Sequence, residues 1–339
     1  MWPFDCKNVV AQHNKFMNAH GPMDSYGSHI DYGNENVVFQ YNYSYNNEGG
    51  FAEILGDNIN CGYRYNISVN DGYREDPNGV PWNKKGKIFW VSNYCGSNTV
   101  RCSNTGTFIY NNTVFVNETL NPEIYFWPDV GDVHVYNNLI VVSQEGEIIS
   151  TLLENDQNEL YISHNLFYDS SRIDLDSDLE NNAIYVNPLL LNSDYLGENS
   201  PEAYQTQNDS PVIGSGFLIN GSTDTTNYIK HNGGLDYFGN TVSHNLPPNI
   251  GAFNGAGNVN ILSTKSDEIK IYPNVTCDIV NILINNYSGP INTEIYGLGG
   301  HFMGSQSGDM ISLMSFSSGI YFCVINYRHI KKIFRVVKI

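Results

Sequence analysis

Basic residues are scarce in this sequence. Its 339 residues include 17 lysines and arginines against 35 aspartates and glutamates, a formal net charge of −18 at pH 7. Nucleic acids and anionic membrane surfaces are bound through basic groups, so this balance of charge repels both. The charge therefore argues against nucleic acid as a partner.

Long apolar runs are absent too. Apolar runs such as IFWV are far shorter than the roughly 20 residues that a membrane-spanning helix needs, so no membrane span is predicted. The N-terminus, MWPFDCKNVV, also lacks the basic segment and apolar stretch of a signal peptide.

Paired cysteine motifs are missing as well. None of the six cysteines has the CxxC spacing of a zinc site, and no cofactor motif is present. Free or buried thiols are the simplest interpretation. A Cys95–Cys102 bridge would close a short loop in an oxidising compartment, and a bridge between Cys277 and Cys323 is a second alternative.

What the sequence does contain is a repeat. Short apolar segments end on an asparagine six times, at spacings of 28, 24, 46, 26 and 27 residues. A period in the mid-twenties predicts a parallel β-helix, with one turn of three short strands per repeat. The 46-residue interval is interpreted as one coil with an inserted loop at 71–87. The repeated asparagines are Asn14, Asn42, Asn66, Asn112, Asn138 and Asn165.

Stacked coils explain the choice of asparagine. Equivalent side chains on adjacent coils lie about 4.8 Å apart, so their amides form a ladder of hydrogen bonds. Asparagine also tolerates the left-handed backbone of a tight turn. The ladder predicts that all six asparagines stack in equivalent turns.

The repeat fades after about residue 170. Residues 172–254 are rich in proline and glycine turns and are expected to close the end of the solenoid. Further on, short apolar strands at intervals of 10 to 15 residues predict a small β-sandwich. We therefore expect a β-helix domain at 1–254, a linker at 255–265 and a sandwich at 266–339.

The sandwich resembles a known family. IKIYPN (269–274), SFSSGIYFCVI (315–325) and the terminal KKIFRVVKI resemble the C-terminal sorting domain of proteins exported by the type IX secretion system of Bacteroidota. One departure is Val275, where the family usually has a second proline. The resemblance implies a secreted or cell-surface protein whose residues 266–339 contact the secretion machinery. Such proteins also carry an N-terminal export signal, so we expect residues 1–261 to lack their N-terminal coils.

Residues 1–254 resemble the secreted right-handed parallel β-helix, or pectate-lyase-like, proteins of such bacteria. The segments that carry this resemblance are IDYGNENVVFQYNYS, NNEGGF and RYNISVNDG, with SPVIGSG, DYFGN and PNIGAF in the tail. Many proteins of this architecture are polysaccharide lyases or glycoside hydrolases. The resemblance implies an all-β fold, a right-handed parallel β-helix followed by a small β-sandwich, and a polysaccharide as substrate, although a fold alone assigns no reaction.

Acidic residues recur at one position of the coil. His29 and Glu53 each lie 13 residues before a repeated asparagine, and Asp31 lies 11 before. Strand side chains alternate between faces, so these three share a face that points away from the core. Alignment of FDCKNVV with IDYGNENVV places Asp5 beneath Asp31. Asp5, Asp31 and Glu53 are therefore predicted to stack on adjacent rungs, about 5 Å apart.

Carboxyl groups at such distances can divide the roles of acid and base. Repulsion raises the pKa of one, which can act as general acid while its neighbour stays ionised, as in glycosidases. A solvated surface and a calcium site are the alternatives. His29 is a candidate proton relay or a structural histidine.

Aromatic residues continue this row. Tyr125 and Trp127 fall on the face of the carboxylates, and Trp90 lies on the strand between them. Exposed aromatic rings beside acids suit the binding of sugars. Glu48 is a candidate for the rim of the cleft or for an ordinary turn, and Arg64 for substrate binding or for packing.

Three functions fit these residues. The leading hypothesis is a secreted glycoside hydrolase that uses Asp31 and Glu53. A polysaccharide lyase would instead need a basic proton abstractor and charge neutralisation. A non-catalytic glycan-binding or adhesin scaffold is the third. The basic residues available to a lyase are Arg74, Lys84, Lys85, Lys87 and His29.

Overall fold

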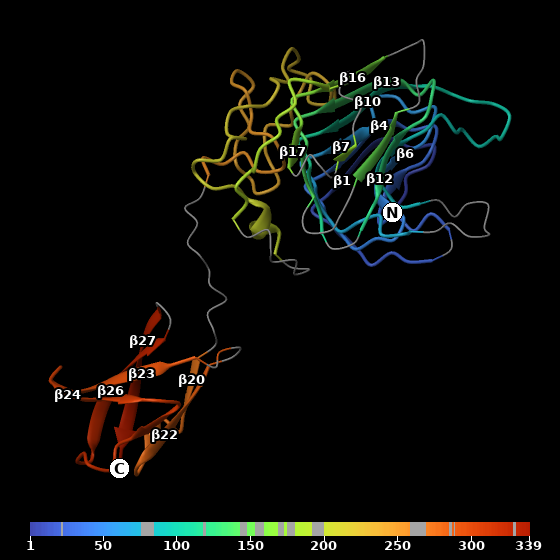
Figure 1. The fold of residues 1–339 in the computed structure, drawn as a ribbon. Coiled ribbons are helices and arrows are strands. Elements are labelled where there is room, and N and C mark those ends of the chain that lie inside the picture. Colours follow the sequence, from blue (N-terminus) through green and yellow to red (C-terminus); the bar gives the residue numbers. More distant parts are fainter. Residues whose placement is uncertain are drawn as a thin grey trace. The chain divides into compact units, whose positions relative to one another are not determined.

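The computed structural model divides the chain into two compact units, Met1–Asn260 and Ile261–Ile339 (Figure 1). The residues described are 1–21, 23–75, 85–117, 120–142, 148–152, 159–168, 173–174, 180–191, 200–257, 269–284, 287, 289–327 and 330–339. No helix in these ranges is long and apolar enough to cross a membrane.

The first unit is built from three parallel sheets, and each coil of the chain adds one strand to each sheet in turn. In the described residues, sheet A contains β1 (Lys7–Gln12), β4 (Glu35–Gln40), β7 (Gly62–Arg64), β10 (Asn104–Tyr110), β13 (Gly131–Tyr136), β16 (Leu160–Ser163) and β19 (Glu180–Asn181). Sheet B contains β2 (Lys15–Met17), β5 (Tyr43–Tyr45), β8 (Ile67–Val69), β11 (Thr113–Val116), β14 (Leu139–Val142) and β17 (Leu166–Tyr168). Sheet C contains β3 (His29–Ile30), β6 (Gly50–Ile54), β9 (Lys87–Val91), β12 (Glu123–Phe126), β15 (Ile148–Leu152) and β18 (Ile173–Asp174).

The second unit is a small sandwich of two sheets. One sheet has the order β20 (Ile269–Tyr272), β22 (Ile279–Ile284), β25 (Met310–Ser312). The other has the order β21 (Val275–Thr276), β27 (Ile330–Lys338), β26 (Gly319–Tyr327), β23 (Ile291–Gly297), β24 (Phe302–Ser307). Apolar residues of both sheets form one core. The predicted fold class, a parallel β-helix followed by a small β-sandwich, is confirmed.

The asparagine ladder is confirmed at all six positions. Each side-chain amide donates to the side-chain oxygen of the next asparagine along the stack, over 2.9 to 3.0 Å. Asn66 also donates to the same oxygen of Asn112 from its backbone, at 3.0 Å, so the 46-residue interval is one coil with an insertion. At the far end Glu180 accepts the amide of Asn165 at 2.7 Å.

The left-handed backbone lies one residue earlier than expected. The residue before each ladder asparagine has a φ between 51° and 57°, and the asparagine itself does not. The asparagine is therefore selected for its amide, which bonds along the stack, rather than for its backbone. The six left-handed residues are His13, Tyr41, Tyr65, Asn111, Asn137 and His164.

The turn-rich tail of the first unit covers part of sheet A (Figure 1). It includes the short 3₁₀ helix η2 (Pro201–Tyr204). Tyr228 and Val242 of the tail pack in one cluster with Val38 and Phe108 of sheet A. Asn60 fixes the tail further, because its side chain donates to the Thr226 carbonyl at 2.6 Å.

The cysteines follow two different patterns. Cys95 and Cys102 form a disulfide, one of the alternatives that the sequence left open. Cys277 is exposed and Cys323 is buried, and both thiols are free, so the bridge considered between them is wrong. Burial raises the pKa of the Cys323 thiol to about 11.

Candidate functional site

The outer face of sheet C carries most of the predicted site residues. Ile30, Ile54 and Val91 point into the core of the coil, so the residues that alternate with them point out. Strand pairing places the outward residues side by side on successive rungs. In order along the sheet they are His29, Glu53, Trp90 and Tyr125.

A cavity of about 260 Å³ opens on this face. Glu53, Trp90 and Trp127, three of the predicted site residues, line it together. Trp90 is only 7% exposed, so the expectation of an exposed ring is wrong. The ring is covered because Tyr26 packs 6.3 Å away and the Lys87 ammonium lies 5.6 Å from its centroid.

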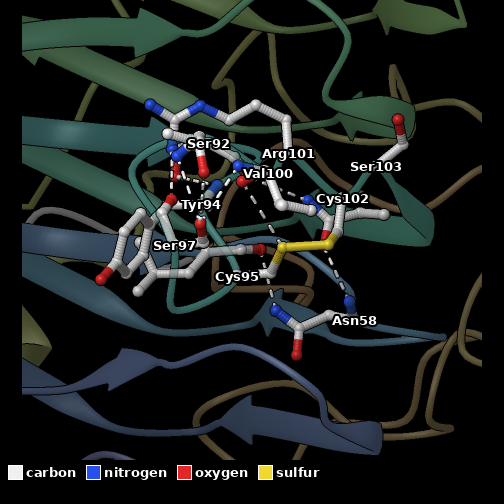
Figure 2. The surroundings of a disulfide bond; sticks show 12 residues. Asn58, Ser92, Tyr94, Cys95, Ser97, Val100, Arg101, Cys102 and Ser103 are labelled. Atoms are coloured by element: carbon white, nitrogen blue, oxygen red, sulfur yellow. Dashed lines mark hydrogen bonds between the residues drawn. A yellow bond between two sulfur atoms is a disulfide. The ribbon is translucent and has the colours of Figure 1, made fainter.

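The loop between β9 and β10 forms one wall of the cavity through Tyr94, Asn98 and Arg101. The Cys95–Cys102 disulfide closes this loop, with Cα atoms 5.8 Å apart (Figure 2). Backbone bonds tie it to the neighbouring turn, since the Tyr94 carbonyl accepts the amide of residue 56 at 2.7 Å. The wall is therefore fixed both covalently and by hydrogen bonds.

Arg101 brings a cation to the mouth of the cavity. Its guanidinium carbon lies 5.5 Å from the Trp127 ring and 6.0 Å from the Tyr94 ring. Figure 2 shows Arg101 beside the disulfide, on the loop that also carries Tyr94. Among the described residues that line the cavity, Arg101 is the one cation. The sequence did not single it out, because it lies in a loop outside the repeat.

His29 lies between two carboxylates. Its Nδ1 is 3.4 Å from Oε2 of Glu53, and its Nε2 is 3.9 Å from Oδ2 of Asp31. The ring also stacks on Trp2, at 5.0 Å between centroids. Burial lowers the pKa of His29, but the hydrogen bond to Asp31 and the negative charges nearby outweigh burial and raise the pKa overall. The charges that act on it are Glu53, Asp31 and Asp24.

This arrangement corrects the predicted stack of carboxylates. His29, and not Asp31, is the neighbour of Glu53 on the adjacent rung. Asp31 lies two residues after His29, just beyond the end of β3, with the imidazole between the two acids. The raised pKa of His29 favours the imidazolium, whose positive charge offsets part of the repulsion that was expected between Asp31 and Glu53.

Asp5 does not belong to the cluster. The backbone amides of His29 and Asp31 donate to the carbonyls of Met1 and Pro3, which brings Trp2 beside His29. Asp5 is exposed, has a φ of 47° and bonds through its backbone to Tyr32. The predicted register was wrong because Asp5 lies in the turn rather than on the strand.

Asp24 is a member of the site that the sequence analysis missed. It lines the cavity together with Glu53. Arg74 holds the segment before it, because its guanidinium donates to the carbonyls of Gly21 at 3.0 Å and of Met23 at 2.6 Å. Asp24 lies on the connection ahead of β3, outside the repeat, so no periodic signal marked it.

Glu48, predicted at the rim of the cleft, holds this same segment. Its carboxylate accepts the Gly21 backbone amide at 2.8 Å and the Arg74 Nε–H at 3.2 Å, and lies 2.7 Å from Nδ1 of His20. Burial raises the pKa of Glu48, but the Gly21 amide and Arg74 lower it more, so the net shift is downward. Glu48 does not line the cavity; it positions the segment that carries Asp24.

Tyr125 lies one rung beyond Trp90 and does not line the cavity. The buried ammonium of Lys87 lies 5.5 Å from the Tyr125 ring and forms an ion pair with Glu123 at 3.3 Å. Lys87 therefore packs between the two rings and supports Trp90. Lys84, one of the bases considered for a lyase, lies outside the described residues.

Arg64 serves the tail and not the cavity, which corrects its place among the substrate-binding candidates. It is 4% exposed and lies on sheet A. Its guanidinium donates to Tyr110 Oη and to the His231 carbonyl, both at 3.0 Å, and lies 5.1 Å from the Tyr228 ring. Packing of the tail against sheet A accounts for this arginine.

The donor set near the cavity is one of carboxylates, an imidazole and a guanidinium. Within the ranges that the structure describes, no group of three or more His, Cys, Asp or Glu residues is arranged to hold a metal ion. What the site offers is proton transfer, from the carboxyl groups around His29, beside aromatic rings that suit a sugar.

Comparisons with known proteins give a partial similarity. No family model matches the chain. Over 137 residues, the chain is 33% identical to a lacto-N-biosidase of Bifidobacterium longum subsp. longum. The aligned stretch covers 38% of this chain but only 8% of that relative, so the similarity concerns a small part of a much longer protein.

Proposed function

We propose that the β-helix unit is a glycoside hydrolase that cleaves a glycan in the cavity on sheet C. The observation that carries the proposal is the convergence of Glu53, Asp24 and two tryptophans on one cavity of about 260 Å³. Tryptophan faces cover the C–H faces of sugar rings, and carboxyl groups supply the acid and base of glycoside cleavage. The partial similarity to a lacto-N-biosidase supports the same class of reaction.

The acid/base pair is drawn from Asp24 and Glu53, which line the cavity, and from Asp31, which does not line it and lies across His29 from Glu53. The side chain of Glu53 is 3% exposed and that of Asp31 is 20% exposed, so the two differ in their access to water. Such differences in environment can divide the roles of acid and base between two carboxyl groups, and the single variants assign which group takes which role. His29 positions the acids, because it lies within ion-pair distance of both Asp31 and Glu53.

A lyase is less well supported. Its proton abstractor must be an unprotonated base near the substrate, and the raised pKa of His29 disfavours the unprotonated imidazole. Lys87 is paired with Glu123, and Arg74 with Glu48. Of the basic residues that were candidates for a lyase, none of those described lines the cavity.

The test is the product that the purified protein forms. We expect release of a free disaccharide or monosaccharide from 4-nitrophenyl lacto-N-bioside or from a panel of neutral oligosaccharides, without the ultraviolet absorbance of unsaturated sugars. Unsaturated products would establish a lyase. Binding of the glycans without cleavage would show that the protein is a non-catalytic glycan-binding scaffold.

We also propose that the protein is exported and that its β-sandwich is the sorting domain. The strand motifs of residues 266–339 support this, and the Cys95–Cys102 disulfide fits an oxidising compartment outside the cytoplasm. Residues 1–254 are then the working domain and 255–265 the linker. Fusion of residues 255–339 to a periplasmic reporter in a type IX-competent host should bring the reporter to the cell surface. A reporter that stays in the periplasm would contradict the proposal.

A further inference from the structure

A second hollow lies on the first unit, on a different sheet from the cavity. It is an open groove of about 870 Å³ on the outer face of sheet A, and it shares no lining residue with the cavity. One wall is formed by sheet A and the turns before its strands. The opposite wall is the tail segment 224–230. The sheet-side wall includes Asn36, Asn60, Gly106, Asp132, His134 and Tyr161.

The groove runs across the coils. Its lining residues come from β4, from the turn before β7, and from β10, β13 and β16, which are consecutive strands of sheet A. Four steps of the strand spacing give a length of roughly 19 Å. A site of this length accommodates an extended chain of several sugar units rather than a single small molecule.

A stacked aromatic pair forms the floor at one end. The His134 and Tyr161 rings are nearly parallel, at 13°, with centroids 4.9 Å apart. Asp132 and the Tyr136 hydroxyl fix the imidazole, at 2.6 and 2.9 Å. Tyr161 remains 49% exposed. The groove therefore has a fixed aromatic pair at this end, in which Tyr161 is half exposed to whatever occupies it.

The opposite wall is also fixed. The Asn60 amide donates to the Thr226 carbonyl at 2.6 Å, and the Asn60 side-chain oxygen accepts the Tyr228 backbone amide at 3.2 Å. Asp224 accepts the Thr226 backbone amide and hydroxyl, at 2.9 and 2.7 Å. The walls are held in place by hydrogen bonds of the protein itself, so the groove is formed before a ligand arrives.

The chemistry of the groove discriminates among ligands. Among the described residues that line it, three carboxylates, Asp132, Glu159 and Asp224, face one ammonium, that of Lys230, which disfavours polyanions. The sheet-side strands β4, β10 and β13 are each paired on both sides, so a peptide cannot add as a further strand. Amide and carboxylate oxygens beside a flat ring are the groups that bind hydroxyls and the C–H face of a sugar.

We infer that this groove is a second, non-catalytic binding site for an extended, neutral glycan chain. Such a site would hold a polymer on the enzyme while the cavity acts on it. The inference extends the proposed function but does not depend on it, because the two hollows share no residue and glycan binding can be measured without cleavage.

The test uses calorimetric titration of the full chain carrying Glu53→Gln, which keeps the probes intact. The probes are β-linked hexasaccharides of N-acetylglucosamine, glucose, galactose and mannose, with hexagalacturonate as an acidic control. We expect at least one neutral hexasaccharide to bind, more tightly than its disaccharide, and the acidic one not to bind. Tyr161→Ala should weaken binding about three- to tenfold, since one aromatic contact is lost.

Matched variants separate stacking from folding. Tyr161→Phe should keep the affinity, because the ring is retained. Tyr185→Ala removes another exposed tyrosine of the same unit, one outside the groove, and should leave the affinity unchanged. If Tyr161→Ala does not fold, Lys230→Ala on the opposite wall serves as the second probe and should weaken binding by a smaller factor.

The outcomes distinguish this inference from the proposed function. The inference would be overturned if no neutral hexasaccharide binds. It would also be overturned if Tyr161→Ala and Tyr185→Ala change the affinity equally. Tyr161→Ala, introduced into the chain that keeps Glu53, should turn over 4-nitrophenyl lacto-N-bioside as fast as the wild-type chain does. Glycan binding that depends on Tyr161, in a chain that cleaves no glycoside, would keep the groove and reject the hydrolase.

Discussion

The asparagine ladder and the outer face of sheet C are formed by the same coils, yet they are built in opposite ways. The ladder repeats one residue on successive rungs, and each amide bonds to the next. The outer face changes residue on every rung, from His29 to Glu53 to Trp90 to Tyr125. A position that only has to stack keeps its residue, whereas variation at equivalent positions marks the place where groups of different chemistry are brought together.

The two regions also differ in how their polar groups are compensated. The ladder is neutral and its amides have hydrogen-bond partners. The outer face gathers the carboxylates of Asp31 and Glu53 around one imidazole. Concentrated charge in a partly buried place is the arrangement in which proton transfer is tuned. Mutations should therefore affect stability at the ladder and activity at the outer face.

The largest effect on stability is expected at the centre of the ladder. Asn66 is fully buried and donates its amide to Phe39 and Asn112, at 2.9 Å each, while its oxygen accepts both amides of Asn42. Asn66→Ala leaves several buried groups unsatisfied and should lower the free energy of unfolding by about 3–4 kcal/mol, measured in urea. Asn14→Ala, at the exposed end of the ladder, should cost less than about 1 kcal/mol. Equal losses would contradict a ladder stabilised by buried bonds.

Asp71, which stacks on Asn47 in a second, shorter ladder, should make the free energy of unfolding depend on pH. Asp71 is buried and accepts hydrogen bonds from Asn47 and Ser68, and burial raises its pKa to about 6. The folded state favours the protonated form of Asp71. The protein is therefore most stable below the ordinary pKa of an aspartate, and it loses stability as the pH rises from there to about 6. The loss should reach about 2–3 kcal/mol, and Asp71→Asn should remove it. Urea titrations from about pH 4 to 7 measure it. If the free energy of unfolding of the variant falls with pH as steeply as that of the wild-type chain, Asp71 is not the origin of the pH dependence.

The disulfide should matter for both stability and the cavity wall. Replacing Cys95 and Cys102 by serine releases a short loop and should cost about 2 kcal/mol in the free energy of unfolding. The Michaelis constant should rise, because Tyr94 and Arg101 then lose their fixed positions. Cys277→Ser, at a free and exposed thiol, should change neither quantity. An intact Michaelis constant without the disulfide would show that the loop is not part of the site.

The smallest effect is expected at the aromatic wall of the cavity. Trp127→Ala should weaken substrate binding by about 1 kcal/mol, as expected for the loss of one ring contact, and should leave the fold intact. The dissociation constant of a non-cleaved glycoside, measured by fluorescence or calorimetry, gives the value. Tyr185→Ala, outside the cavity, is the matched control. An unchanged affinity in Trp127→Ala would show that the ring does not contact the substrate.

Most of what the sequence could predict was set by the repeat. The recurring asparagine located Asn66 and Asn112 in one ladder across the 46-residue interval, and the register placed Glu53 and Tyr125 on one face. These inferences held because stacked coils impose the same geometry on every rung.

The misses lie at residues outside the repeat, or at residues of the repeat whose surroundings come from elsewhere in the chain. Asp24 lies on the connection before β3. Asp5 lies in a turn, where the spacing of the repeat does not determine which residues face each other. Trp90 is enclosed by groups outside its own rung. Arg64 bonds to His231, 167 residues away, a contact that only the folded tail brings about.

The most direct test of the account is the turnover of a chromogenic glycoside by Asp24→Asn, Asp31→Asn and Glu53→Gln, compared with the wild-type chain. Glu35→Gln, a carboxylate paired with Lys7 on sheet A, is the control and should keep its activity. We predict that kcat falls by about a thousandfold or more for two of the three acids and by about tenfold to a hundredfold for the third, which only positions His29. Activity within about threefold of wild type for all three variants would contradict the claim that the sheet C cavity is the site of hydrolysis.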